Sequence, residues 1–323
     1  MIAAIWGVNF VVIDVGLASL PPLLFAGLRF VAAAFPAVLF VRRPAIPWRW
    51  FALIGLPLGA GQFGLLFMGM HMGMPAGLSS LVLQMQALFT ALLAAVMLHE
   101  RPRPAQAAGM VVAFAGIALI GLTLGQGSPL LAFALCVAAA GMWGLANIGL
   151  RRAQPPDAFA FMVWVSLVPP IPLLALSLIF EGPQADLHAL THISPGGIGA
   201  LLYIAYISTL VGYGAWGWLM RRYAAGQVAM YALLVPPFGM SSAALLLGEH
   251  VTAWDAVAAL LIVSGVALGS LRRRTAPASA PASPGEGPQN PVRGTLTSPE
   301  PGQGHPHTTG NPRLGRDPAE GHA

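Results

Sequence analysis

Long apolar runs constrain this chain more than any other feature of its sequence. Ten runs of 18 or more mostly apolar residues can be distinguished: 2–19, 22–41, 50–71, 76–98, 105–124, 129–150, 158–180, 197–220, 227–247 and 253–271. As an α-helix, each can cross a hydrocarbon core about 30 Å thick, and none alternates as a barrel strand does. Only 8% of the residues are charged, against about 25% in soluble domains. The sequence therefore predicts an all-α integral membrane protein with ten transmembrane helices.

The arginines predict how these helices are oriented. The chain has no lysine, and most of its 16 basic residues lie in alternate connections between runs or just after the last run. They are Arg42, Arg43, Arg49, Arg101, Arg103, Arg151, Arg152, Arg221, Arg222, Arg272, Arg273 and Arg274. Because positive residues stay on the cytoplasmic side, we predict that both termini are cytoplasmic. The net charge of +5 is thus an orientation signal, and no nucleic-acid binding is expected.

The chain also repeats itself at an offset of 149 residues. Three pairs of residues share this offset: Gly77 and Gly226, Glu100 and Glu249, and Gly116 and Gly265. Each half contains five runs, an odd number, so the second half must enter the membrane inverted relative to the first. Inverted repeats are typical of secondary transporters, in which rocking exposes one central site to each side in turn.

Three segments follow from this pattern. Residues 1–124 form the first five-helix repeat, and residues 129–271 form the second, inverted one. Residues 275–323 contain no aromatic residue and many Pro, Gly, Ser and Thr. Such a stretch buries too little apolar surface to offset its ordering entropy, so we predict a disordered cytoplasmic tail.

Several motifs carry a resemblance to a known family. They are Trp6-Gly7-Val8-Asn9-Phe10, Pro21-Pro22, Gly27-Leu28-Arg29-Phe30, Gly73-Met74-Pro75-Ala76-Gly77, Glu100-Arg101, Trp143-Gly144 with Asn147, Val211-Gly212-Tyr213, Leu233-Leu234-Val235-Pro236 and Leu245-Leu246-Leu247-Gly248-Glu249. Through them, residues 1 to 271 resemble the EamA family of the drug/metabolite transporter superfamily. One departure is Asp14, where the family often has a lysine.

The resemblance implies two inverted five-helix EamA repeats around a cavity lined mainly by the third, fourth, eighth and ninth helices. It also implies a secondary transporter of the bacterial inner membrane that exports small metabolites by alternating access. Within the family the chain most resembles bacterial exporters of O-acetylserine and cysteine, which makes these amino acids the leading substrates. A broader amino-acid or drug/metabolite exporter or facilitator is the alternative. A channel or structural membrane protein is another, but neither explains the duplication.

Asp14 and Arg29 are charges inside the apolar runs. A lone charge in hydrocarbon costs several kcal/mol, so each needs a partner, water or an interface. Both lie about 10 Å from the same membrane surface, on either side of the first hairpin. Arg29 therefore binds a substrate carboxylate, snorkels to the surface, or forms a structural ion pair with Asp14; the sequence leaves these alternatives open.

Uncharged polar and aromatic residues supply the other candidates for substrate binding. Gln62 and Gln84 lie mid-span, where an amide facing lipid would be unpaired. Gln86 is about 200° around the helix from Gln84, so we expect that both cannot face one cavity. Further candidates are Tyr213, Trp216 and Tyr231, although aromatic residues in such spans are more often packing or interface anchors. Asn9 and Asn147 are interpreted as interhelical contacts.

Three carboxylates are candidates for coupling transport to an ion: Asp14, Glu100 and Glu249. Glu100 and Glu249 end the fourth and ninth runs near water, which equally fits an interfacial cap. Proton antiport, substrate exchange and facilitated diffusion stay open, and so does a homodimer.

Enzymatic function is not expected. Without lysine the chain has no Walker P-loop, and His99-Glu100 lacks the second histidine of a zinc-protease motif, because Arg103 stands there. We predict no cofactor and no metal site. The expected partners are a small-molecule substrate and the lipid bilayer.

Overall fold

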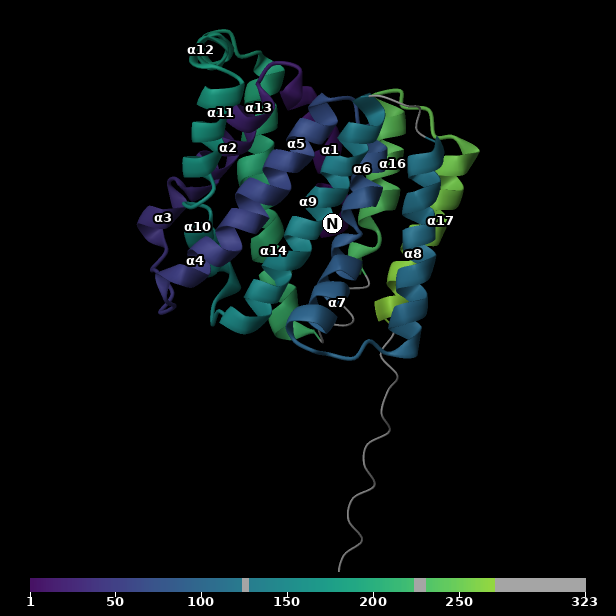
Figure 1. Ribbon diagram of the computed structural model, residues 1–323. Coiled ribbons are helices and arrows are strands. Elements are labelled where there is room, and N and C mark those ends of the chain that lie inside the picture. The colour runs from purple at the N-terminus through teal and green to yellow at the C-terminus, as the bar shows by residue number, and fades with distance from the viewer. Residues whose placement is uncertain (124–127, 224–230, 271–323) are drawn as a thin grey trace, which may run out of the picture. The chain divides into compact units, whose positions relative to one another are not determined.

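Helices dominate the described part of the chain, which comprises residues 1–123, 128–223 and 231–270 (Figure 1). This computed structural model has no β-strand within those ranges. The first ten helical elements are α1 (Ile2–Leu17), α2 (Pro22–Ala34), α3 (Ala37–Phe40), α4 (Trp48–Gly55), the π-helix η1 (Leu56–Phe63), α5 (Gly64–His71), α6 (Ala76–Leu83), α7 (Gln86–Met97), α8 (Pro104–Thr123) and α9 (Ser128–Ala153). They are followed by α10 (Ala158–Val165), α11 (Pro170–Phe180), α12 (Pro183–Thr191), α13 (Pro195–Leu202), the π-helix η2 (Tyr203–Val211), α14 (Gly212–Arg222), α16 (Val235–Leu246) and α17 (Ala253–Ser270). The predicted tail, 275–323, lies outside the described residues.

Within the described residues, seven helical segments are long and apolar enough to cross a membrane: Pro22–Phe40, Trp48–His71, Ala76–Met97, Pro104–Thr123, Leu130–Ala153, Ala158–Phe180 and Pro195–Leu219. Three further apolar helices are shorter: Ile2–Leu17, Val235–Leu246 and Ala253–Gly269. The prediction of an all-helical chain with long apolar segments is therefore confirmed for the described residues. The count of ten spans stays a prediction, and the beginning of the ninth run, 227–230, is not described.

Two of the long segments contain a π-helix in their middle. η1 lies between α4 and α5, and η2 lies between α13 and α14. At η2, the hydroxyl of Thr209 donates a hydrogen bond to the carbonyl oxygen of Ile204, five residues earlier, at 2.8 Å. Because hydrocarbon offers no hydrogen-bond partner to irregular backbone, such segments belong where they face protein or a cavity.

A third irregularity separates α6 from α7. The N–H groups of Gln84 and Met85 donate to the carbonyl oxygens of Leu81 and Val82, three residues earlier, at 3.1 and 3.0 Å. The helix therefore tightens for one turn and changes the direction of the side chains that follow.

The positions 149 residues later than this turn, 233–234, form the turn before α16. Pro236 and Pro237, which predict a bend in the ninth run, follow it in the first turn of α16. The N–H groups that the two prolines lack cost no hydrogen bond there, because the first N–H groups of a helix have no intrahelical partner.

Close glycine contacts join the two halves of the chain. A Cβ atom added at Gly7 of α1 would lie 2.5 Å from Cβ of Phe238 in α16, and one added at Gly144 of α9 would lie 2.8 Å from Cβ of Phe89 in α7. Phe89 and Phe238 are themselves 149 residues apart. The first helix thus packs on the ninth predicted helix in the same way as the sixth packs on the fourth.

Carboxylate contacts tie helices together at the end of the molecule that carries α12, here called the upper end (Figure 1). Glu181, after α11, accepts hydrogen bonds from the N–H groups of Leu23 and Leu24 in the first turn of α2, at 2.7 and 3.0 Å. An acidic side chain at a helix N-terminus satisfies free N–H groups and complements the helix dipole. The opposite end, at the α7–α8 connection, is called the lower end.

The glycine contacts generate a paired prediction on one helix. Gly144→Ala should lower the free energy of unfolding by about 1–3 kcal/mol, because the added methyl group overlaps α7. Gly141→Ala, three residues earlier, meets no atom within 4 Å and should be neutral or stabilising by up to about 1 kcal/mol through helix propensity.

Thermal unfolding in detergent can be followed through Cys136, which is the single cysteine and is buried. A thiol-reactive fluorogenic dye should label it only when the protein opens. Equal shifts of the midpoint in the two variants would contradict the packing described for α9.

Candidate functional site

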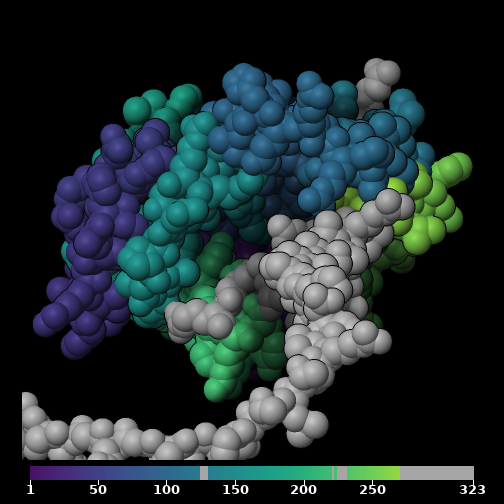
Figure 2. Space-filling view, turned by 90° about the horizontal axis from the view of Figure 1, so that it is seen from below, coloured from purple at the N-terminus to yellow at the C-terminus, as the bar shows by residue number. Residues whose placement is uncertain are grey.

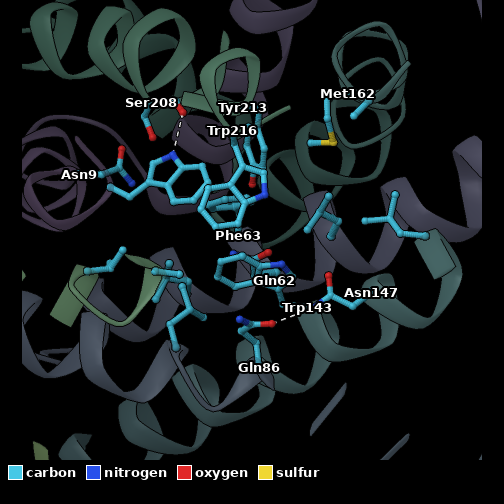
Figure 3. A pocket seen from close by; sticks show the side chains of 18 of the residues that line it. Asn9, Gln62, Phe63, Gln86, Trp143, Asn147, Met162, Ser208, Tyr213 and Trp216 are labelled. Atoms are coloured by element: carbon cyan, nitrogen blue, oxygen red, sulfur yellow. Dashed lines mark hydrogen bonds between the residues drawn. The ribbon is translucent and has the colours of Figure 1, made fainter. Parts of the chain in front are cut away.

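A cavity of about 400 Å³ lies among the helices and is lined by residues from both sequence repeats (Figure 3). Its lining includes Leu150, Pro155 and Ala158, which flank the α9–α10 connection. This connection lies at the lower end, where Arg151 forms an ion pair with Glu100 after α7. Seen from below, the molecule is hollowed between α7, α9 and α14 (Figure 2). The cavity therefore reaches the lower end of the molecule.

The structure brings five of the six predicted substrate-binding residues to this cavity: Arg29, Gln62, Gln84, Tyr213 and Trp216. The sixth, Tyr231, has an exposed fraction of 65% and lines a neighbouring hollow instead. That hollow shares Trp6 and Trp216 with the cavity. Besides the helices that the resemblance implies, α1, α2 and α9 also contribute to the lining.

The expectation that Gln84 and Gln86 cannot both face one cavity is wrong, since both line it. It assumed a continuous helix with 100° per residue, whereas the tightened turn between α6 and α7 redirects the second side chain. Each amide also bonds to another segment. Nε2 of Gln84 donates to the carbonyl oxygen of Ala232 at 3.0 Å, and Oε1 of Gln86 accepts from Nδ2 of Asn147 at 2.8 Å.

Arg29 is a buried cation with few partners. Its exposed fraction is 1%. Nη2 donates to the hydroxyl oxygen of Thr209 at 2.9 Å, and Cζ lies 3.8 Å from the centre of the Phe63 ring. Nε and Nη1 have no hydrogen-bond partner. The rings of Phe30 and Phe67 lie farther away, at 5.0 and 6.0 Å. The protein itself thus stabilises the positive charge through one hydroxyl and aromatic rings, and leaves two donor nitrogens free.

Two of the alternatives for Arg29 do not hold. At 1% exposure its guanidinium does not snorkel to the surface. It makes no ion pair with Asp14, because the ion pair found within the described ranges is that of Arg151 with Glu100. The sequence predicts that Asp14 and Arg29 lie at the same depth in the membrane. In the structure, the guanidinium of Arg29 is directed toward η1 and η2, whereas Asp14 is partly buried on α1.

Three aromatic rings form one corner of the cavity. The ring of Trp6 lies 5.4 Å from that of Tyr213 and 5.3 Å from that of Trp216, centre to centre. Nε1 of Trp6 donates to the carbonyl oxygen of Ser208 in η2 at 3.1 Å. Such rings offer an apolar surface to an uncharged substrate side chain, and their faces also attract cations.

The amide side chains around the cavity fall into two groups. Asn147 is held by Gln86 and by the hydroxyl oxygen of Thr90, to which its Nδ2 donates at 2.8 and 3.0 Å. This agrees with its interpretation as an interhelical contact. Asn9 and Gln62 differ, because Oδ1 of Asn9 and Oε1 of Gln62 are buried without a partner. Polar atoms in this condition are uncommon and need an explanation.

Sequence reasoning missed Trp6 and Trp143 as cavity residues and interpreted Asn9 as a packing residue. The signal in the sequence was a Trp-Gly pair in the first predicted helix of each half, at Trp6-Gly7 and Trp143-Gly144. In each pair the glycine packs on a neighbouring helix, while the tryptophan before it lines the cavity.

The coupling candidates are placed very differently. Glu100 forms a half-exposed bidentate pair with Arg151, with N–O distances of 2.7 and 3.3 Å. Glu249, its counterpart in the repeat, accepts from the N–H groups of Ala76 and Gly77 at the start of α6, at 2.7 and 3.0 Å. Glu249 thus ties the end of α16 to α6, in the same way that Glu181 is tied to α2. None of the three coupling candidates lines the cavity.

The cavity holds little that could bind a metal or a bulky cofactor. Arg29 is the charged residue of its described lining, which contains no Asp, Glu, His or Cys. No group of three or more such side chains that could bind a metal ion occurs in residues 1–123, 128–223 and 231–270. The arrangement of a fixed cation, free amide oxygens and aromatic faces suits a small polar molecule with an anionic group.

Comparison with known proteins identifies related sequences along this whole helical region. Residues 1–122 and 128–271 match the EamA-like transporter family. A protein of Escherichia coli (strain K12) named "Probable amino-acid metabolite efflux pump" is 43% identical over 82% of this chain and 91% of its own length. A protein of Streptantibioticus cattleyicolor named "Probable terminal-alkyne amino-acid exporter" is 29% identical over 84% of this chain and 90% of its own.

A solved crystal structure shares the fold. It aligns with a TM-score of 0.53 at 21% sequence identity and covers 82% of this chain and 95% of the other. This likeness concerns the fold alone.

Glu249 and Glu100 generate a second paired prediction. Glu249→Gln removes the charge at the α6 N-terminus and one of two acceptor oxygens, which should lower the free energy of unfolding by about 1–3 kcal/mol. Glu100→Gln weakens an exposed ion pair and should cost less than about 1 kcal/mol. Labelling of Cys136 during heating again reports the midpoint of thermal unfolding for each variant. A larger loss for Glu100→Gln would refute the assigned roles.

Proposed function

Because this chain belongs to the EamA-like transporter family, we propose that it exports small zwitterionic amino-acid metabolites by alternating access. Cysteine and O-acetylserine are the leading substrates. One observation carries the proposal: the buried guanidinium of Arg29 touches the cavity with Nε and Nη1 unpartnered. An exporter with broader amino-acid specificity is the nearest alternative.

Electrostatics supports an anionic group at this position. A buried cation without a counter-ion is costly in a membrane protein, and the described cavity lining contains no carboxylate to pair with Arg29. A substrate carboxylate offers acceptor oxygens for these N–H groups in charge-assisted hydrogen bonds. The same charge disfavours amino acids with a cationic side chain.

Access to Arg29 requires one local movement. Its 1% exposure means that the free nitrogens are covered by the protein. The ring of Phe63 lies over the guanidinium and also lines the cavity. A rotation of this ring within η1 uncovers the guanidinium, and the π-helix, with its wider turn, is a suitable place for such a movement.

The arginine pattern predicts which side of the membrane the cavity faces. If the arginine-rich connections are cytoplasmic, the cavity reaches the cytoplasmic end, and the upper end, held by Glu181 and Glu249, is the external one. This arrangement is an inward-open state ready to load a metabolite. The equivalent glycine contacts of α1 with α16 and of α9 with α7 support the two inverted repeats that the opposite state requires.

The function is tested by counterflow in proteoliposomes, which needs no assumption about the coupling ion. The panel comprises cysteine, O-acetylserine, serine, threonine, aromatic amino acids, lysine and a neutral sugar. We expect saturable exchange of cysteine and O-acetylserine and none of lysine or the sugar. Exchange across all the neutral amino acids would favour the broad exporter, and exchange of the sugar alone would exclude the proposal.

Arg29 provides the variant for this assay. Arg29→Gln should weaken the apparent affinity for cysteine by about 10- to 100-fold, since it loses a charge-assisted pair. Arg151→Gln, which changes an exposed arginine outside the cavity, is the matched control and should leave affinity unchanged. Unaltered affinity in Arg29→Gln would remove the carboxylate-binding role.

Orientation has its own test. We propose an inner-membrane location with both termini in the cytoplasm. Epitope tags at either end should be protected from externally added protease in intact spheroplasts and become accessible after permeabilisation. A tag that is cleaved in intact spheroplasts would contradict the proposed ten-span topology.

A further inference from the structure

Four side-chain atoms are buried without a hydrogen-bond partner in the described part of the chain. They are Oδ1 of Asn9, Oε1 of Gln62, and Nε and Nη1 of Arg29. All three residues line the same cavity, and their exposed fractions are 7%, 1% and 1%. Because the buried unsatisfied side-chain atoms of the described residues all belong to the lining of one cavity, they point to a ligand rather than to poor packing.

The four atoms divide into two chemical kinds. The nitrogens of Arg29 are donors on a cation, and the oxygens of Asn9 and Gln62 are acceptors on neutral amides. A carboxylate can satisfy only the donors. The acceptors need a donor group, and an ammonium group carries three N–H donors that suit such oxygens. An α-amino acid carries both kinds of group.

We propose that Asn9 and Gln62 form an ammonium subsite beside the carboxylate subsite of Arg29, so that the cavity recognises the zwitterionic backbone of an α-amino acid. This inference rests on the proposed function, because it takes the cavity as the transport site. Asn9 comes from α1 and Gln62 from η1, so the substrate bonds to two helices as well as to α2 through Arg29.

The other amides of the lining are already held in place. Gln86 and Asn147 bond to each other, and Gln84 donates to the carbonyl oxygen of Ala232. Asn9 and Gln62 differ because an amide oxygen of each is buried without a partner. The described lining contains no carboxylate that would hold a lone cation in the cavity. Neutral amide oxygens can still accept hydrogen bonds from the ammonium group of a substrate.

The test compares cysteine with two analogues that each lack one charge: 3-mercaptopropionate, without the ammonium group, and cysteamine, without the carboxylate. Apparent affinities are measured by competition with labelled cysteine in counterflow. In the unmodified protein, cysteine should be preferred to either analogue by about 10- to 100-fold, the range expected for hydrogen bonds to a charged group.

Two variants remove the acceptors while keeping side-chain size, Asn9→Leu and Gln62→Met. Each should weaken cysteine binding toward the level of 3-mercaptopropionate and leave the affinity for 3-mercaptopropionate unchanged. Arg29→Gln should instead weaken the binding of both cysteine and 3-mercaptopropionate, because both carry a carboxylate. Arg151→Gln, which changes a residue outside the cavity, is the control, and its ratio of cysteine to 3-mercaptopropionate should match that of the unmodified protein.

Gln62→Glu keeps an acceptor oxygen and separates this role from folding defects. It should retain or increase the preference for cysteine over 3-mercaptopropionate, even if Gln62→Met is unstable. Unchanged ratios in both Asn9→Leu and Gln62→Met would overturn the ammonium subsite. Equal affinity of the unmodified protein for cysteine and 3-mercaptopropionate would also overturn it, yet leave an exporter of carboxylates. Absence of exchange for every amino acid would remove the proposed function itself.

Discussion

A bilayer offers no hydrogen-bond partner to the backbone, and this constraint links the fold to the cavity. Regular helices satisfy their own N–H and C=O groups, so a break is tolerated only where it faces protein or water. In the described residues the long segments are interrupted at η1, at η2, at the turn between α6 and α7, between α2 and α3, and between α10 and α11. The first three of these contribute Gln62, Ser208 and Gln84 to one cavity. Part of the irregular backbone therefore also forms the surface of the cavity.

The constraint applies equally to side chains. Trp6, Gln84, Gln86 and Asn147 all have hydrogen-bond partners within the protein. The nitrogens of Arg29 and the oxygens of Asn9 and Gln62 do not, although their burial makes a missing partner costly. Under the proposed function, a bound substrate supplies the partners that these buried donors and acceptors lack.

Hydropathy and arginine spacing predict the helical segments because both depend on composition over about 20 residues. The same pattern picks out Arg29 and Gln62, since polar groups rarely stand in such runs without a reason. Rotation about the helix is not encoded so simply. Asp14 and Arg29 lie at one depth but do not meet, and Gln84 and Gln86 share the cavity because of a turn that their sequence does not announce. Tyr231 is aromatic and lies in a predicted span, as Tyr213 and Trp216 do, but it lines the neighbouring hollow and not the cavity.

Residues that occupy equivalent positions in a duplicated chain need not make equivalent contacts. Glu249 bonds to two N–H groups of α6, whereas Glu100 bonds to Arg151. Under alternating access, different contacts at the two positions are expected, because each end of the protein is closed in one state and open in the other while the sequence stays the same. Contacts at a closed end must also be reversible. A carboxylate on helix N-terminal amides meets this need, since water replaces both partners when the end opens, and the net loss is only about 1–3 kcal/mol. A difference of that size keeps both states accessible to the same molecule.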